Sequence, residues 1–129
     1  MVGTGKTIVV VDDDAGIRES LRFLLALDGF TVEGFDSAAS FLAQCDLTHV
    51  DCLLIDQGMP ETTGLTLSAQ LRAFGVTTPI IIVTADTNPD LERLARASGV
   101  YAIVHKPFDA GTLQRIIADA IASGPARRP

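Results

Sequence analysis

Short apolar runs alternate along the chain with stretches of helical spacing. Four apolar runs occupy residues 8–11, 52–55, 79–83 and 102–104, and a weaker, alternating run occupies residues 31–35. The first three are continuous and do not alternate with polar residues, which is typical of parallel strands covered on both faces. The weaker run suits a strand at the edge of a sheet. The pattern therefore predicts five strands.

Between these runs, apolar residues recur at the spacing of amphipathic helices. The five stripes are Ile17, Leu21, Leu24 and Leu25; Ala38, Phe41 and Leu42; Leu65, Leu67, Leu71 and Phe74; Leu91, Leu94 and Ala95; and Leu113, Ile116, Ile117, Ala120 and Ile121. Residues that favour helix starts precede three stripes and glycines follow three, namely Asp14, Ser37 and Asp109, then Gly29, Gly75 and Gly99. The sequence thus predicts a strand and a helix in alternation, five times over.

This alternation predicts an α/β domain with a parallel sheet, right-handed crossovers and helices on both faces. The length of 129 residues is that of one domain. We assign the domain to residues 6–122 and expect flexible ends at residues 1–5 and 123–129.

Composition and charge exclude several classes of protein. Hydrophobic residues make up 47% and charged residues 20%, as in folded globular proteins, and the net charge of −6 argues against nucleic-acid binding by this domain. No apolar run approaches the roughly 18 residues of a membrane span, and no secretion signal precedes residue 6. Two cysteines, Cys45 and Cys52, suit free thiols in a reducing compartment. We expect a cytoplasmic protein without membrane contact.

Acidic residues stand where two of the expected strands end. Asp12 and Asp13 follow the first strand, and Asp56 follows the third. If these strands are neighbours, the three carboxylates meet beyond the carboxyl edge of the sheet, where sheets of this kind hold their ligands. Such a cluster needs protonation or a cation, and an all-oxygen set without histidine or thiolate suits Mg²⁺ best.

Three further residues at strand ends point to a phosphoryl group. Lys106 follows the fifth strand and binds phosphate as a point charge, while Thr84 and the amide of Ala85 follow the fourth strand and can donate hydrogen bonds. Asp56 can act as the nucleophile and form an aspartyl phosphate. Positioning and electrostatics then do most of the chemistry.

With these motifs in order, the chain resembles the receiver domain of bacterial two-component response regulators. The residues that carry the resemblance are V-V-D-D-D ending at Asp14, D-Q-G-M-P-E-T-T-G from Asp56 to Gly64, I-I-V-T-A ending at Ala85, and K-P-F from Lys106. The resemblance extends from Lys6 to about Ala122. It implies the flavodoxin-like fold with strand order 2-1-3-4-5, an order named for this family and not worked out from the residues.

The resemblance also implies roles. Asp56 would be the phosphoacceptor, and Asp13 and Asp56 would bind Mg²⁺ directly, with Asp12 acting through water and the carbonyl of Gly58 completing the set. Thr84 and Lys106 would contact the phosphoryl group beside the Ala85 amide, and the bond before Pro107 would be cis. The chain would catalyse only its own phosphorylation and dephosphorylation.

Two departures from the family pattern bear on switching. Relatives usually carry Tyr or Phe three residues before the lysine, where this chain has Ile103; Tyr101 would share its side of a regular strand. We therefore expect the conformational change on phosphorylation to be smaller, or to be coupled through other residues, at the face made by the fourth helix, fifth strand and fifth helix. The second departure is Gly58, which with Asp86 flanks the path of the hydrolytic water and should influence the lifetime of the phosphoryl group.

The implied partners are a sensor histidine kinase or histidine phosphotransfer protein, which would dock on the first helix, and a downstream protein or an output domain missing from this sequence. A homodimer would use the face of the fourth helix, fifth strand and fifth helix. Two alternatives stay open. One is a phosphohydrolase with an aspartyl nucleophile, although Gly58 stands where such enzymes commonly carry a second acid. The other is a phosphate-independent scaffold.

Overall fold

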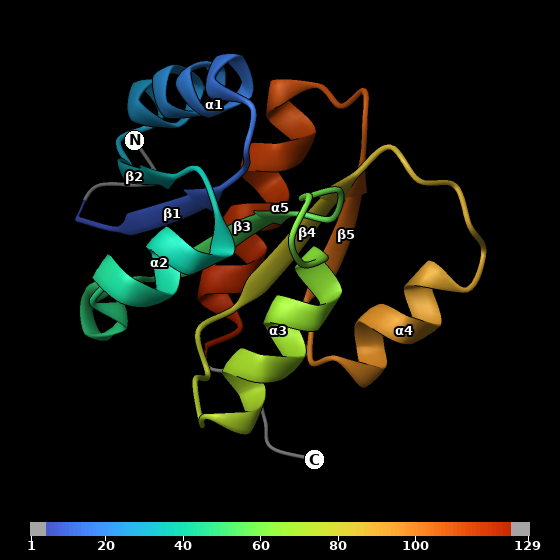
Figure 1. The fold of residues 1–129 in the computed structure, drawn as a ribbon. Coiled ribbons are helices and arrows are strands. Elements are labelled where there is room, and N and C mark those ends of the chain that lie inside the picture. Colours follow the sequence, from blue (N-terminus) through green and yellow to red (C-terminus); the bar gives the residue numbers. More distant parts are fainter. Residues whose placement is uncertain (1–4, 125–129) are drawn as a thin grey trace.

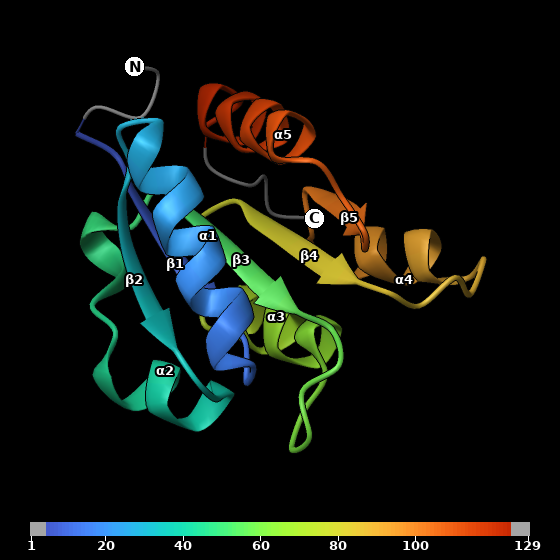
Figure 2. The same cartoon turned by 90° about the horizontal axis from the view of Figure 1, so that it is seen from above.

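The computed structural model describes residues 5–124, which form one parallel sheet with helices on both faces (Figures 1 and 2). The strands are hydrogen-bonded in the order β2-β1-β3-β4-β5, and every pair is parallel. Their bounds are β1 Thr7–Val11, β2 Thr31–Phe35, β3 Cys52–Asp56, β4 Ile80–Thr84 and β5 Ala102–His105. The predicted fold class and strand order are confirmed.

The three central strands are the continuous apolar runs of the sequence. Every residue of β3 and β4 is buried, as are the last four residues of β1. The edge strand β2 has no fully buried residue, which confirms the interpretation of its weaker pattern. Cys52 lies in β3, where burial raises the pKa of its thiol to about 12, and burial raises that of Cys45 to about 11. Both cysteines are free.

Alternate residues of the strands face two separate apolar cores. Helices α1 and α5 cover the face that carries Ile8, Val10 and Leu54, and α2, α3 and α4 cover the opposite face. Their bounds are α1 Ala15–Leu27, α2 Ala38–Gln44, α3 Gly64–Ala73, α4 Leu91–Ala97 and α5 Ala110–Ala122. Figure 2 shows α1 and α5 together on one side of the sheet. The sandwich fixes the strand ends in space, and with them the acidic residues.

The predicted helix ends are largely confirmed. Asp14, Ser37 and Asp109 each accept a hydrogen bond from a backbone N–H three residues later, and Gly29, Gly75 and Gly99 have positive φ angles just after helices. Three residues expected on apolar stripes are exposed instead: Leu42 on α2, Leu94 on α4, and Phe74, which follows α3 and is 81% exposed. The short 3₁₀ helix Leu47–His49 has too few residues to show a stripe in the sequence.

Most of the two ends expected to be flexible lies outside the described residues 5–124. Within them, Ser123 ends α5 and donates its hydroxyl to the carbonyl of Asp119 at 2.8 Å. Among the described residues, no helix is long and apolar enough to cross a bilayer.

Candidate functional site

The three predicted acids meet at the carboxyl edge of the sheet. Asp56 is the last residue of β3 and Asp12 follows β1; the two strands are adjacent, with Val11 beside Ile55. One carboxylate oxygen each of Asp12, Asp13 and Asp56 lies within 4.8 Å of the others. Asp12 and Asp56 are buried, whereas Asp13 is exposed. The cluster that strand adjacency predicted is therefore present.

The backbone around Asp12 is fixed from three directions. Its N–H donates to the carbonyl of Phe35 at 3.1 Å, its carbonyl accepts from Nη1 of Arg18 at 2.7 Å, and its Oδ1 accepts from the N–H of Asp14 at 2.9 Å. Burial raises the pKa of the Asp12 carboxyl, and the nearby Asp56 carboxylate raises it further, against the lowering effect of the Asp14 N–H.

The donor set fits a hard divalent cation. Carboxylates that are partly removed from water and crowded together are costly when ionised, and a cation offsets that cost. The donors are all oxygens on one open side of the sheet, and no histidine or thiolate belongs to the cluster. Mg²⁺ prefers such ligands and keeps several waters, so an exposed ligand such as Asp13 is no obstacle.

Lys106 reaches Asp56 from the end of β5, the strand at the edge of the sheet. Its Nζ donates to Oδ1 of Asp56 at 3.2 Å, although fifty residues separate them in sequence. The backbone places it there: the N–H of Lys106 donates to the carbonyl of Thr84 at 2.7 Å, just beyond the paired residues Thr84 and His105. The peptide bond between Lys106 and Pro107 is cis.

Thr84 ends β4 beside this ion pair and is almost fully buried. Its Oγ1 accepts a hydrogen bond from the N–H of Asp86 at 2.9 Å. Ala85 follows it at the same edge. Together with the β3–α3 loop these residues surround an open hollow of about 470 Å³, lined by Asp56, Gln57, Gly58, Thr63, Thr84, Ala85, Asp86 and Lys106.

The β3–α3 loop returns closely to the strand that it leaves. Gly64 begins α3 against the carbonyl of Asp56; a Cβ at this position would lie 2.8 Å from that oxygen and 2.9 Å from Cδ1 of Ile82. Met59 is buried. The loop that carries Gly58 is therefore packed under the site, and the close approach at Gly64 leaves no room for a side chain.

Ile103 and Tyr101 lie at different distances from Thr84. Ile103 is half-buried in β5 and packs on the core beneath α3 and α4. Tyr101 precedes β5, and its N–H donates to the carbonyl of Ile80, at the opposite end of β4 from Thr84. Its hydroxyl lies 3.4 Å from Oγ of Ser123. Tyr101 therefore cannot supply the aromatic ring that position 103 lacks.

Two residues that shape the site carried no signal in the sequence. Arg18 holds the carbonyl of Asp12, and Gln57 accepts from the N–H of Leu65 through Oε1 at 2.9 Å. Both act through a single long side chain whose partner depends on how helix and strand are packed. Neither the spacing nor the residue type marks them in advance.

The comparisons with known proteins agree with the fold. The sequence model of the family described as "response regulator receiver domain" matches residues 8–118. The chain belongs to this family, the receiver domains of two-component signal-transduction regulators.

Its relatives are transcriptional and response regulators. The chain is 36% identical to the transcriptional regulatory protein FixJ of Bradyrhizobium diazoefficiens over 88% of its own length and 56% of FixJ. It is 31% identical to the response regulator protein TodT of Pseudomonas putida, over 99% of the chain and 56% of TodT. The chain thus spans just over half the length of these relatives.

Solved structures give the same result. The response regulator StyR matches with a TM-score of 0.85 and 35% identity, over 93% of this chain and 61% of StyR. Full-length FixJ from B. japonicum matches with a TM-score of 0.82 and 34% identity, over 93% of this chain and 59% of FixJ.

Proposed function

We propose that Asp56 accepts a phosphoryl group in a Mg²⁺-dependent reaction, from the phosphohistidine of a sensor histidine kinase or a histidine phosphotransfer protein. The observation that carries this proposal is the convergence of three carboxylates from β1 and β3 with the ammonium of Lys106, 3.2 Å from Oδ1 of Asp56. A carboxylate that lies beside a cation site and a lysine can act as a nucleophile toward phosphorus. The cation and the lysine are then already in place to stabilise the charge of the phosphoryl group.

Each residue has a defined part in the transfer. A carboxylate oxygen of Asp56 attacks phosphorus, the phosphorus–nitrogen bond breaks, and the electron pair remains on the departing imidazole. Asp13, Asp56 and the carbonyl of Gly58 would hold Mg²⁺, with Asp12 acting through water. The ion, when bound, neutralises charge on the phosphoryl oxygens and on the crowded carboxylates.

Lys106 and Thr84 would then bind the transferred group. The Lys106 ammonium bonds to Asp56 before transfer, and a phosphoryl oxygen is the stronger charged acceptor once it arrives. The Thr84 hydroxyl and the Ala85 amide stand at the end of the neighbouring strand as further donors. Replacing Lys106 should leave metal binding largely intact and weaken the response to phosphorylation by about 1.5–3 kcal/mol, the value of one charged hydrogen bond.

A groove beside α1 supports docking of the phosphodonor there. It measures about 430 Å³, lies between α1 and the β5–α5 segment, and includes Lys106 in its lining. Ile17, Leu21, Leu24 and Phe108 contribute apolar surface to it. A helix of the donor that lies in this groove would bring its phosphohistidine to Asp56.

The output would be a change in protein contacts. The relatives continue well beyond the part that this chain matches, and DctR of Rhodobacter capsulatus, for example, is a transcriptional regulatory protein of which the chain covers 62%. We propose a downstream protein or an attached output domain as the receiver of the signal. Leu94 and Tyr101 are exposed on α4 and before β5, which favours a dimer through the α4–β5–α5 face.

Because Ile103 replaces the usual aromatic residue, we expect a muted change at that α4–β5–α5 face on phosphorylation. Comparison of amide chemical shifts with and without a phosphoryl mimic measures it. A large response centred on this face would contradict the expectation.

An adduct experiment tests the main proposal. The protein is incubated with Mg²⁺ and a small phosphodonor, and intact mass is measured, with Asp56→Asn and a chelator as controls. We expect one phosphoryl group on the wild type and none in either control. An adduct that survives the substitution, or no adduct at all, would remove the proposal and favour a phosphate-independent scaffold.

A further inference from the structure

Both ends of the β3–α3 loop are tied to one residue, Gln57. Its own N–H donates to the carbonyl of Val83 at 3.0 Å, which continues the sheet by one residue. Its carbonyl accepts from the N–H of Gly64 at 3.3 Å, and its side-chain Oε1 accepts from the N–H of Leu65 at 2.9 Å. The loop between Gly58 and Thr63 is thereby closed at its base.

The side chain of Gln57 accepts a hydrogen bond from one of the first backbone N–H groups of α3. Leu65 is the second residue of α3, and the first amides of a helix have no partner within the helix. The cap residue Thr63 accepts from the N–H of Thr66, so Gln57 supplies the acceptors for the two amides before it. An ordinary cap belongs to the residue just before the helix, whereas this one comes from the residue that follows Asp56 at the end of β3.

Gly58 follows Gln57 directly. In the proposed function its carbonyl is the one backbone ligand of the cation. Glycine has the greatest backbone freedom of all residues, so holding its carbonyl toward a cation costs conformational entropy unless the neighbouring chain is already fixed. Gln57 fixes one side of Gly58, and the buried Met59 fixes the other.

We propose that Gln57 is a positioning residue for Mg²⁺: through its bond to Leu65 it holds the β3–α3 loop, and with it the Gly58 carbonyl, in place beside Asp56. This inference rests on the proposed function, since it concerns the same cation. It adds a residue that touches neither the ion nor the phosphoryl group.

The variant Gln57→Met tests it, because methionine has a similar length and no oxygen acceptor. We expect the dissociation constant for Mg²⁺, measured by titration calorimetry without any phosphodonor, to rise about tenfold, as when a partner that orients a metal ligand is lost. In the adduct assay the Mg²⁺ concentration for half-maximal rate should rise by the same factor, and the rate at saturating Mg²⁺ should return to the wild-type value.

Two further variants separate positioning from simple helix stability. Gln57→Glu keeps the oxygen acceptor and should bind Mg²⁺ at least as well as the wild type. Ser68→Ala removes a hydrogen bond of similar strength within α3, from Oγ to the carbonyl of Gly64 at 2.8 Å, and should lower the melting temperature without changing Mg²⁺ affinity.

The outcomes are distinct. Unchanged Mg²⁺ affinity in Gln57→Met, equal losses in Gln57→Met and Ser68→Ala, or a weakened Gln57→Glu would each overturn the inference, even if the adduct forms. If Gln57→Met does not fold, Gln57→Ala takes its place in the same titration. Failure of the adduct assay in the wild type would refute the proposed function instead, because the calorimetric comparison needs no phosphoryl transfer.

Discussion

Two loops border Asp56, and they are held in opposite ways. The β3–α3 loop is joined by Gln57 to β4 and to the start of α3, and its Met59 is buried. The six residues between β4 and α4, 85–90, are all exposed, and the hydrogen bonds from their backbone N–H groups to side-chain acceptors join residues two positions apart. The conformation of the β3–α3 loop is therefore fixed by contacts with the rest of the fold, whereas that of residues 85–90 is fixed by their own side chains.

The local bonds of the second loop run in series. The N–H of Asp86 donates to Oγ1 of Thr84, that of Asn88 to Oδ1 of Asp86, and that of Asp90 to Oδ1 of Asn88, each at 2.9 Å. Asp90, at the cap position of α4, makes no side-chain cap bond. Each link closes only a short turn, so each can be lost singly. The difference teaches that the proposed metal side of the site is preorganised and the Thr84 side is free to change.

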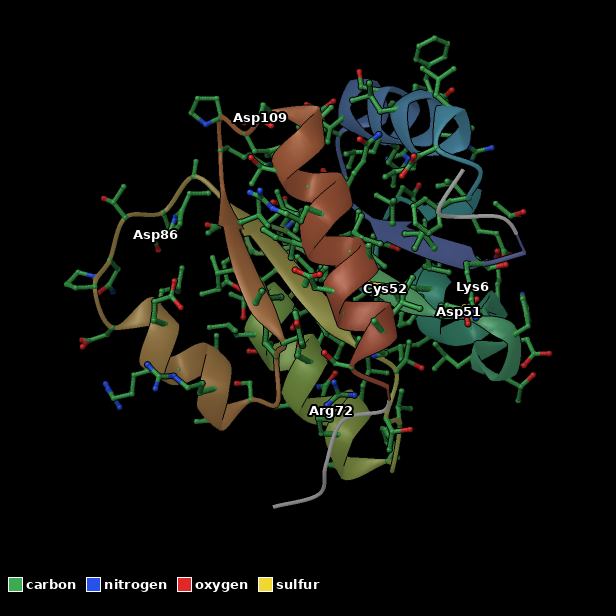
Figure 3. The ribbon with its side chains drawn as sticks, turned by 180° about the vertical axis from the view of Figure 1, so that it is seen from behind. Lys6, Asp51, Cys52, Arg72, Asp86 and Asp109 are labelled. Carbon is green, nitrogen blue, oxygen red and sulfur yellow. The ribbon has the colours of Figure 1, made fainter. Side chains whose placement is uncertain are left out.

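The far end of α4 is held much more firmly, and breaking it should have the largest effect. Arg72 of α3, labelled in Figure 3, donates through Nε and Nη2 to the carbonyl of Gly99, at 3.0 and 2.9 Å, and through Nη1 to that of Val76 at 2.7 Å. We expect Arg72→Met to lower the free energy of unfolding by about 3 kcal/mol, since charged hydrogen bonds are lost and the carbonyls are left unpaired. Urea denaturation measures it.

Arg72→Lys is the matched control. It keeps the charge but cannot bond to two carbonyls with a planar fork, so it should recover only part of the loss. A variant Arg72→Met as stable as the wild type would mean that α4 is held at neither end.

The next largest effect on the free energy of unfolding is expected in the β3–α3 loop. Gly64→Ala would place a Cβ 2.8 Å from the carbonyl of Asp56, while a Cβ on Gly58 would meet only Oδ2 of Asp56 at 3.9 Å. We expect Gly64→Ala to lower the free energy of unfolding by about 1–3 kcal/mol, as overpacking does, and Gly58→Ala to change it by less than about 0.5 kcal/mol. Equal effects of the two substitutions would show that the loop yields as a whole.

The same contrast explains how much the sequence could predict. The strands and the acids at their ends follow from runs such as 52–55, because burial on both faces and parallel pairing are global consequences of the apolar pattern. The strand order came from the family resemblance and not from the residues. The convergence of Asp12, Asp13 and Asp56 needed only the adjacency of β1 and β3.

What escaped prediction is set by single side chains. Gln57, Arg18 and Arg72 each bond to a backbone group whose position follows from the packing of a helix on the sheet. Phe74 was placed on the α3 stripe by its spacing, but the helix ends one residue earlier and the ring points to water. A sequence pattern predicts whether a residue is buried or exposed on average, but not which group a single side chain will bond to.

A smaller effect on stability is expected from removing the aspartates at the cap positions of α4 and α5. Asp109 accepts from the N–H and the hydroxyl of Thr112, and these bonds lower the pKa of its carboxyl below the ordinary 3.8. A lowered pKa adds stability above 3.8 that is lost as the pH falls through the lowered value. We therefore expect Asp109→Ala to melt earlier than the wild type at pH 7 and the difference to disappear under strongly acidic conditions. Asp90→Ala, without a cap bond to lose, should melt like the wild type at both pH values.

The smallest effect on stability belongs to Asn88, although its effect on motion should be clear. Asn88→Ala removes the acceptor for the N–H of Asp90 and leaves Thr84 and Asp86 untouched. We expect the free energy of unfolding to change by less than about 0.5 kcal/mol, because the residue is exposed and its bond is local. The amide order parameter of Asp90, measured by ¹⁵N relaxation, should fall from about 0.85 toward 0.6. Asn88→Asp keeps an acceptor oxygen and should retain the wild-type value. If Asn88→Ala leaves Asp90 rigid, the loop is held by something other than its own side chains, and the contrast between the two loops does not stand.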